Sequence, residues 1–182
     1  MKIGLISDTH IPEAGKSVPE QVRQVFSEVE LILHAGDLHV LDVLDWLEQI
    51  APVKAVRGNG DDGGYGRPVV PDDPRLLPTQ VMTIEGVRIG VAHVVPLPED
   101  TPWLTLEQTM DRLFGGPVDV IVFGDSHVDY IGEHNGIHLV NPGSPTLPYN
   151  LTGFLGTVGI LEVRNNRIEI DIIPLGEWPI RR

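Results

Sequence analysis

The sequence predicts an α/β fold in which two layers of mixed β-sheet form a sandwich flanked by helices. Three observations lead to this prediction. Apolar runs alternate with segments of helical period in the first half of the chain, short turns separate strand-like segments in the second half, and polar side chains directly follow several strands. The chain has 182 residues, slightly more than a common domain, so we expect one domain over 1–182.

The first half of the chain predicts a βαβαβ unit built on parallel strands. The expected elements are strands at 2–7, 31–36 and 53–58 and helices at 18–29 and 38–50. Ser17 and Glu20 fit a capping box with Pro19 just inside the first helix, and Pro52 ends the second helix. Residues 58–78 are rich in Gly, Pro and Asp without a sustained period, so they predict a long functional loop.

The second half predicts antiparallel hairpins around one helix and one buried strand. The expected elements are a hairpin at 79–93, a helix at 105–114, a buried strand at 118–124, two strands joined by the turn Asn135-Gly136, the segment 141–145, and a hairpin at 157–173 that turns at Asn165-Asn166. Parallel strands followed by hairpins give mixed sheets. Reactive groups in such folds gather at the strand ends.

Composition excludes several classes of function. The net charge of −13 opposes binding to nucleic-acid backbones and anionic membranes. The absence of cysteine excludes disulfides, thiolate zinc sites, iron–sulfur clusters and cysteine nucleophiles. No apolar run approaches the roughly 18 residues of a membrane span, and the first residues do not resemble a cleaved leader, so we expect a cytoplasmic protein.

Polar side chains that suit divalent metals follow the predicted strands. These seven residues come from five separate elements: Asp8 and His10, Asp37, Asn59, His93, and Asp125 with His127. Carboxylate, imidazole and amide groups are ligands for ions such as Mn, Fe, Ni or Zn, and one carboxylate can bridge two ions. The sequence therefore predicts a metal site at one sheet edge.

Each of these residues also has a structural interpretation when it is taken alone. Asp and Asn after a strand often cap or turn the backbone, and a single histidine is more often structural than a ligand. We expect His34 to pack within its strand, His134 and His138 to lie on a hairpin surface, and His39 to be a solvated residue at a helix start. A serine hydrolase using Ser7 or Ser144 is disfavoured because Gly-x-Ser-x-Gly is absent.

Taken together, the motifs resemble the calcineurin-like metallophosphoesterases. Asp8-x-His10, Gly36-Asp37, Gly58-Asn59, His93 and Gly124-x-x-His127 occur in the family order. The resemblance covers Lys2 to about Ser144, and the small size, the GNxD block at 58–61 and Asn141-Pro-Gly-Ser144 look most like the compact bacterial and archaeal phosphodiesterase branch. That branch is also similar to the retromer scaffold subunit. The fold implied is a four-layer αββα arrangement.

The resemblance implies a dinuclear centre with Asp37 as the bridge. Asp8, His10, Asp37 and His127 would bind the first ion, and Asp37, Asn59, His93 and Asp125 the second. Mn is the expected metal, with Fe, Ni, Zn and Mg as alternatives. Asp37, Asn59 and His93 would be the catalytic residues around a water or hydroxide that attacks phosphorus in line.

Two positions depart from the family pattern. Asp125 replaces the usual histidine, which lowers the formal charge of the centre and is expected to weaken attraction for anionic phosphoesters and to favour a harder metal such as Mn. Gly60 stands where larger members have a histidine that can protonate the leaving group. Asp61 and Asp62 are candidates for that acid, but we expect them to be exposed, and an exposed aspartate is ionised at pH 7, which disfavours this role.

The sequence thus predicts a metal-dependent phosphoesterase that acts on diesters, because no cluster of arginines is evident to hold a dianion. Arg57 and Arg67 are near the loop and are candidates for one or two contacts. A nucleotide-derived diester is the generic candidate for the small phosphoester substrate. The alternative is a scaffold of the same fold that has lost turnover. A homo-oligomer formed through the C-terminal hairpin or around Trp103 and Trp178 is a candidate assembly, by resemblance.

Overall fold

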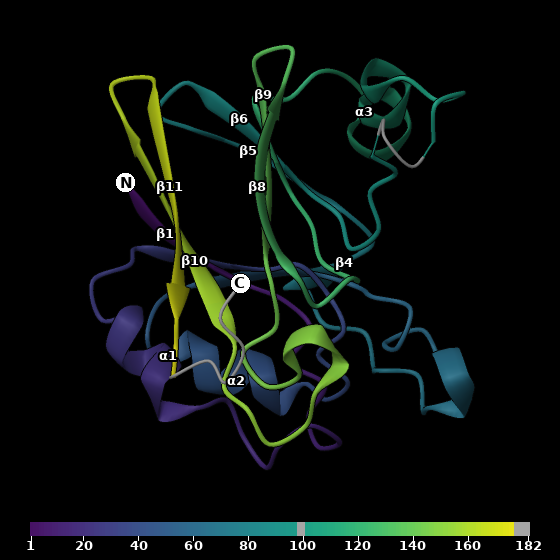
Figure 1. Ribbon diagram of the computed structural model, residues 1–182, viewed down its shortest axis with the longest axis vertical. Coiled ribbons are helices and arrows are strands. Elements are labelled where there is room, and N and C mark those ends of the chain that lie inside the picture. Colours follow the sequence, from purple (N-terminus) through teal and green to yellow (C-terminus); the bar gives the residue numbers. More distant parts are fainter. Residues whose placement is uncertain (98–100, 177–182) are drawn as a thin grey trace.

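The computed structural model describes residues 1–97 and 101–176, which form two β-sheets with helices outside them. The helices are α1 (Glu20–Val25), α2 (Asp42–Glu48) and α3 (Leu106–Phe114), with short 3₁₀ turns at Gly64–Gly66 and Pro148–Asn150. Figure 1 places α1 and α2 at one end of the molecule and α3 at the other, with the strands between them.

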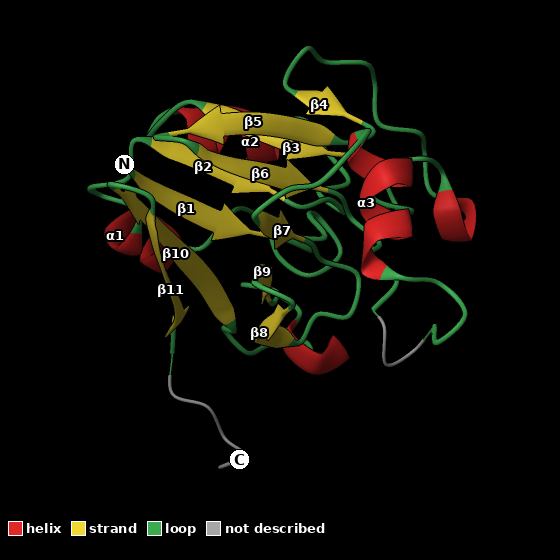
Figure 2. Ribbon diagram, turned by 90° about the horizontal axis from the view of Figure 1, so that it is seen from above, coloured by secondary structure: helices red, strands yellow, loops and turns green. Residues whose placement is uncertain are grey.

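The first sheet is mixed and contains the βαβαβ unit. Its strands are β1 (Lys2–Ile6), β2 (Leu31–His34), β3 (Val53–Val56), β4 (Leu76–Leu77), β10 (Thr157–Arg164) and β11 (Arg167–Pro174), in the order β11-β10-β1-β2-β3-β4. Strands β1 to β4 are parallel, while β10 pairs antiparallel with both β1 and β11. Figure 2 shows β10, β1 and β2 side by side, in the order that they have in the sheet.

The second sheet is also mixed. Its strands are β5 (Gln80–Ile84), β6 (Val87–Val91), β7 (Val120–Val122), β8 (Asp129–His134) and β9 (Ile137–Pro142), in the order β5-β6-β7-β9-β8. The three central strands β6, β7 and β9 are parallel, and the outer strands pair antiparallel with them. The carboxyl ends of β6 and β7 therefore meet at one edge.

Three apolar clusters separate four layers. One lies between α1 and α2 and the first sheet and includes Phe26 and Leu44. The second lies between the two sheets, and the third, with Met110 and Phe114, lies between the second sheet and α3. Alternation along β1 sends Leu5 to the inter-sheet cluster and Ile6 to the helix side. The predicted αββα layering is confirmed.

A glycine in each sheet lets an aromatic ring lie against the strand. A Cβ at Gly4 would lie 3.0 Å from the ring of Phe26, and one at Gly90 would lie 2.8 Å from the ring of Phe114. Both rings are almost fully buried. On both outer faces, a glycine on the strand therefore allows the helix to pack close to its sheet, since a larger residue there would push the ring away.

The predicted elements are present, but both helices of the first half are shorter than expected. The predicted capping box is wrong: α1 has Pro19 as its N-cap, without a side-chain cap bond. The real capping box is at α3, where Thr105 and Gln108 cap each other reciprocally. The loop 58–78 is largely irregular, as predicted, although it ends in the short edge strand β4.

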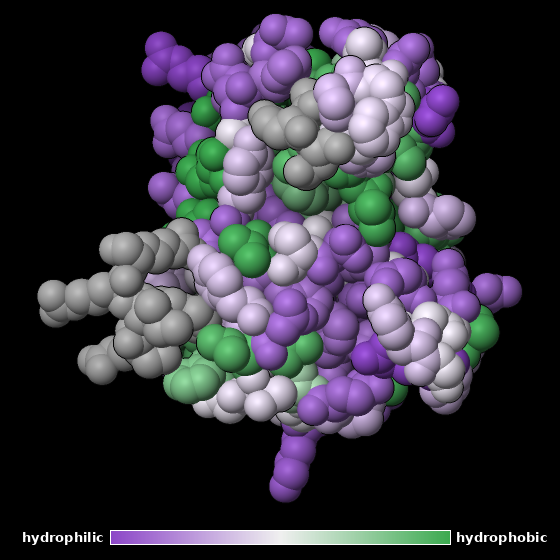
Figure 3. Space-filling model, turned by 45° about the vertical axis from the view of Figure 1, so that its right-hand side comes forward, coloured by the Kyte–Doolittle hydropathy of each residue, from purple (hydrophilic) through white to green (hydrophobic). Residues whose placement is uncertain are grey.

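The surface mixes polar and apolar side chains. Figure 3 shows hydrophobic residues on the face drawn as separate small patches among hydrophilic ones. Tyr65 and Trp103 are 88% and 79% exposed, whereas Trp178, the other tryptophan considered for an oligomer contact, lies outside the described residues. No helix among the described residues has the length and apolar character needed to cross a bilayer.

Candidate metal centre

The ends of strands from both sheets converge on one site. Loops after β1, β2 and β3 of the first sheet and after β6 and β7 of the second carry all seven predicted ligands: Asp8, His10, Asp37, Asn59, His93, Asp125 and His127. Contacts of 4.0 Å or less between their side chains link six of them, and Asn59 joins through His93. The structure therefore brings the predicted set together.

Left-handed backbone conformation is concentrated in these loops. Five of the predicted ligands have positive φ: Asp8 (54°), His10 (47°), Asp37 (56°), Asp125 (72°) and His127 (59°). Such angles are costly for residues with a Cβ and persist where the surrounding structure fixes them. The loops thus hold these side chains in orientations that ordinary strand ends do not provide.

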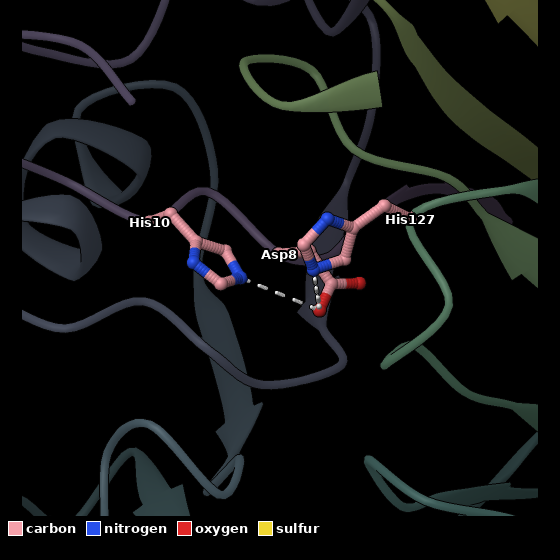
Figure 4. Close-up of side chains that lie close together, drawn as sticks. All are labelled: Asp8, His10 and His127. Carbon is pink, nitrogen blue, oxygen red and sulfur yellow. Dashed lines mark ion pairs between the residues drawn. The ribbon is translucent and has the colours of Figure 1, made fainter. Parts of the chain in front are cut away.

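Asp8, His10 and His127 form the first of three overlapping side-chain groups with metal-binding spacing (Figure 4). The Asp8 carboxylate lies between the two imidazoles, with Oδ1 3.6 Å from His127 Nε2 and 3.9 Å from His10 Nε2. All three residues are buried. Burial lowers the pKa of His127, which keeps this imidazole neutral and available as a ligand.

Asp8, Asp37 and His93 form the second group. His93 Nδ1 is 2.7 Å from the carbonyl oxygen of Ala35, so it donates there and turns Nε2 toward Asp37 Oδ2, 3.6 Å away. Burial alone would lower the pKa of His93, but the carboxylates of Asp37 and Asp8 raise it to about 9. Burial would raise the pKa of Asp37, but the contact with His93 and the amide of Gly60 hold it below its ordinary value.

Asn59 and Asp125 occupy the open side of the site. Both are exposed, and they approach His93 from opposite sheets: Asn59 Oδ1 lies 3.1 Å and Asp125 Oδ1 3.7 Å from its Nε2. The backbone N–H of Asp125 also donates to Asp8 Oδ1. The site therefore has a buried half around Asp8 and an exposed half through which a solute can approach.

Asp61 is buried, which corrects its interpretation as an exposed acid. Its carboxylate accepts backbone N–H groups from Gly58 (2.8 Å), His39 (2.8 Å) and Asp37 (3.0 Å). Burial raises the pKa of Asp61, while the amides of Gly58 and His39 oppose that rise. The residue joins the loop after β3 to the loop after β2, so its role is to position Asp37 and Asn59.

Ser144 and Asn141 support the ligand loops from the second sheet. The Ser144 hydroxyl donates to the carbonyl of Asp8, and Asn141 Nδ2 donates to the carbonyl of Gly124. The Ser144 hydroxyl also accepts from the amide of Leu147. The hydroxyl is thus used in holding the Asp8 loop.

His39 differs from expectation, and the two loop arginines bind groups within the protein. The His39 side chain is 3% exposed, not solvated, and its Nδ1 lies 2.9 Å from Glu13 Oε2. Arg57 binds the carbonyls and carboxylates of its own loop, including Asp62, and Arg67 binds Glu13. Glu13 had no signal in the sequence, because it meets His39 across two loops.

The donor set and its unpartnered atoms fit divalent cations. Asp8 Oδ2 and His10 Nε2 are buried side-chain atoms without a hydrogen-bond partner, and burying such atoms is costly unless something satisfies them. Carboxylate oxygens and imidazole nitrogens facing one another are acceptors that a cation can satisfy together.

Sequence comparisons place this geometry among phosphoesterases. The family model described as the calcineurin-like phosphoesterase superfamily domain matches residues 1–166. A probable metallophosphoesterase of Methanothermobacter thermautotrophicus is 40% identical over 179 residues, covering 97% of this chain and 94% of the relative. A probable metallophosphoesterase of Methanocaldococcus jannaschii is 35% identical over 150 residues, covering 81% of this chain and 70% of the relative.

Solved structures share the fold at lower identity. Vps29 from Entamoeba histolytica in complex with Zn²⁺ aligns with a TM-score of 0.68 and 20% identity, over 97% of this chain and all of that one. A structure described as a novel archaeal phosphodiesterase aligns with a TM-score of 0.63 and 22% identity, over 95% of this chain and all of that one. These similarities establish the fold.

Proposed function

The chain belongs to the calcineurin-like phosphoesterase superfamily, and on that premise we propose that it is a phosphodiesterase that uses two divalent cations. Asp8, His10, Asp37 and His127 would hold the first cation, and Asp37, Asn59, His93 and Asp125 the second. Mn²⁺ is the expected ion. The observation that supports this most directly is the buried Asp8 carboxylate, which has an unpartnered oxygen and faces two imidazoles from opposite sheets.

The bound cations would supply Lewis acidity, lowering the pKa of water and stabilising charge on phosphoryl oxygens. The protein contributes orientation. The Ala35 carbonyl fixes His93 so that Nε2 points into the site, and the amide of Gly60, 2.7 Å from Asp37 Oδ1, fixes the proposed bridging carboxylate. A phosphoester would approach from the exposed side, where Asn59 and Asp125 lie.

A diester with a good leaving group is the substrate class that fits best. Arg57 is bound within its loop and Arg67 is bound to Glu13, so neither is left to grip a dianionic phosphate with its whole guanidinium. Asp125 adds a negative charge where the family usually has an imidazole. The Asp125 carboxylate repels a monoanionic diester less than a dianionic monoester.

Asp125 also directs metal choice, because carboxylates suit hard cations such as Mn²⁺. Replacing Asp125 with His should raise affinity for anionic phosphoesters and shift preference at the second position toward Zn²⁺ or Ni²⁺. If Asp125→His left substrate affinity and metal preference unchanged, the assignment of Asp125 to the second cation would be wrong.

A scaffold is the second candidate, supported by the structural similarity to Vps29. Retention of six of the seven family ligands, with a carboxylate at the seventh, favours the enzyme, since a scaffold has no chemical need for them.

The test is metal content per chain, followed by Mn²⁺-dependent hydrolysis of a bis-aryl phosphodiester. Asp37→Ala is the probe, and Asp111→Ala, an exposed aspartate on α3, is the matched control. We expect about two metal ions per chain and diester hydrolysis in the wild type and in Asp111→Ala. Asp37→Ala should lose both the bound metal and the hydrolysis. A wild type with neither metal nor turnover after Mn²⁺ addition would support the scaffold instead.

A further inference from the structure

His39 has the geometry of a metal ligand that the proposed set does not include. Its side chain is nearly fully buried, and Nε2 has no hydrogen-bond partner. One ligand atom from each of His10, Asp37 and His39 lies within 4.8 Å of the others, and the rings of His10 and His39 have centroids 4.3 Å apart. This is the third overlapping group in the site.

Glu13 determines which nitrogen of His39 is free. Glu13 Oε2 lies 2.9 Å from His39 Nδ1, and the other oxygen, Oε1, lies 3.2 Å from Nε of Arg67. Arg67 thus fixes the carboxylate, which accepts the Nδ1–H of His39. In the neutral imidazole this leaves a lone pair on Nε2. A carboxylate that accepts the outer N–H of an imidazole is the usual support of a metal-bound histidine.

Gly60 leaves room for His39 Nε2 beside the Asp37 carboxylate. A Cβ built at Gly60 would overlap His39 Nε2 and would lie 3.1 Å from Asp37 Oδ1. The imidazole therefore fills the space next to the Asp37 carboxylate that a side chain at position 60 would otherwise take. There, His10, Asp37 and His39 each bring one possible ligand atom within 4.8 Å of the others, and neutral imidazoles and a carboxylate can share one cation.

We infer that His39 Nε2 is a ligand of the cation held by His10 and Asp37, with Glu13 as the carboxylate that orients it. This inference rests on the proposed metal-dependent function. The first position would then draw three imidazoles, from His10, His39 and His127, while the second draws one, from His93.

The experiment measures Mn²⁺ binding to chelator-stripped protein by titration calorimetry. The variants are His39→Ala and Glu13→Ala, and the matched controls are His134→Ala on the β8 hairpin and Glu28→Ala on the surface. We expect two Mn²⁺ per wild-type chain. His39→Ala should weaken one of the two sites at least tenfold, Glu13→Ala should weaken the same site about 10- to 100-fold, and the controls should stay within twofold.

A Co²⁺ spectrum provides a second readout that does not depend on turnover. Loss of an imidazole ligand should change the visible bands of the Co²⁺ protein in His39→Ala but not in His134→Ala. Wild-type-like Mn²⁺ affinity and an unchanged Co²⁺ spectrum in His39→Ala would overturn the inference, even if that variant lost activity, while the proposed function would stand. A wild type that bound no metal would overturn both.

Should His39→Ala fail to fold by circular dichroism, Glu13→Ala decides the outcome, because it leaves every proposed ligand in place. Weakened Mn²⁺ binding in Glu13→Ala, with Glu28→Ala unchanged, would support the inference. Equal Mn²⁺ affinity in Glu13→Ala and Glu28→Ala would overturn the inference.

Discussion

Asp61 offers a direct test of how the two ligand loops of the first sheet are held together. Asp61→Ala removes the acceptor for the amides of Asp37, His39 and Gly58, of which the Asp37 and Gly58 bonds are fully buried. Each buried donor left unsatisfied costs about 1–3 kcal/mol. Part of that cost is offset because alanine removes a carboxylate whose burial is itself unfavourable. We expect the free energy of unfolding to fall by about 3 kcal/mol.

Asp61→Asn sharpens the test because its single carbonyl oxygen can still accept from the two amides that share Oδ2, and its amide group would face the His39 N–H. We expect about half of the alanine effect. Asp62→Ala is the control, since Asp62 is exposed and makes a surface ion pair with Arg57 worth less than about 1 kcal/mol. Urea unfolding in excess chelator, followed by tryptophan fluorescence, measures all three. An Asp61→Ala midpoint equal to that of Asp62→Ala would refute the reasoning.

Three further predictions concern the same region. A Cβ at Gly124 would overlap the Ser7 hydroxyl and lie 2.8 Å from Asp8 Oδ2, so Gly124→Ala should displace Asp8 and lower the bound metal per chain, measured by elemental analysis. His93 has a pKa raised to about 9 without metal, so a cation must displace its proton; Mn²⁺ affinity should rise by up to tenfold per pH unit toward pH 9, and a flat profile would contradict this. Burial lowers the pKa of His34 from 6.5 to about 4, so the unfolded chain takes up the proton first. Stability is therefore full above pH 6.5 and is lost as the pH falls toward 4, by about 1.4 kcal/mol at pH 5.5, a loss that should be missing from the urea unfolding of His34→Gln.

The layers and the convergence of the seven candidate ligands could be predicted because both follow from simple patterns. Buried strands produce apolar runs, and the ends of neighbouring parallel strands meet at one edge, so Asp8, Asp37 and Asn59 had to lie near one another. His93 and His127 follow from the same rule in the second sheet. Strand order predicts that these side chains lie at one edge of a sheet, but it does not predict the backbone angles that orient them.

The start of α2 could not be predicted because the site takes residues from it, whereas α3 lies almost where the sequence predicts it. Leu38 begins an apolar helical pattern, but the loop after β2 needs His39 in a left-handed conformation, with φ of 70°, so α2 starts only at Asp42. The contact between Glu13 and His39 has no sequence period, since it joins two irregular loops. Asp61 was missed as a support because backbone amides, which leave no trace in the sequence, are its partners.

The division of the proposed ligands between the sheets has a mechanical consequence. Asp8, His10, Asp37 and Asn59 belong to loops of one sheet, and His93, Asp125 and His127 to loops of the other. Between the sheets themselves lies an apolar cluster, whose packing has little directional preference. Cations shared across that boundary would act as a cross-link against sliding of one sheet over the other, so loading the centre would stiffen the whole sandwich.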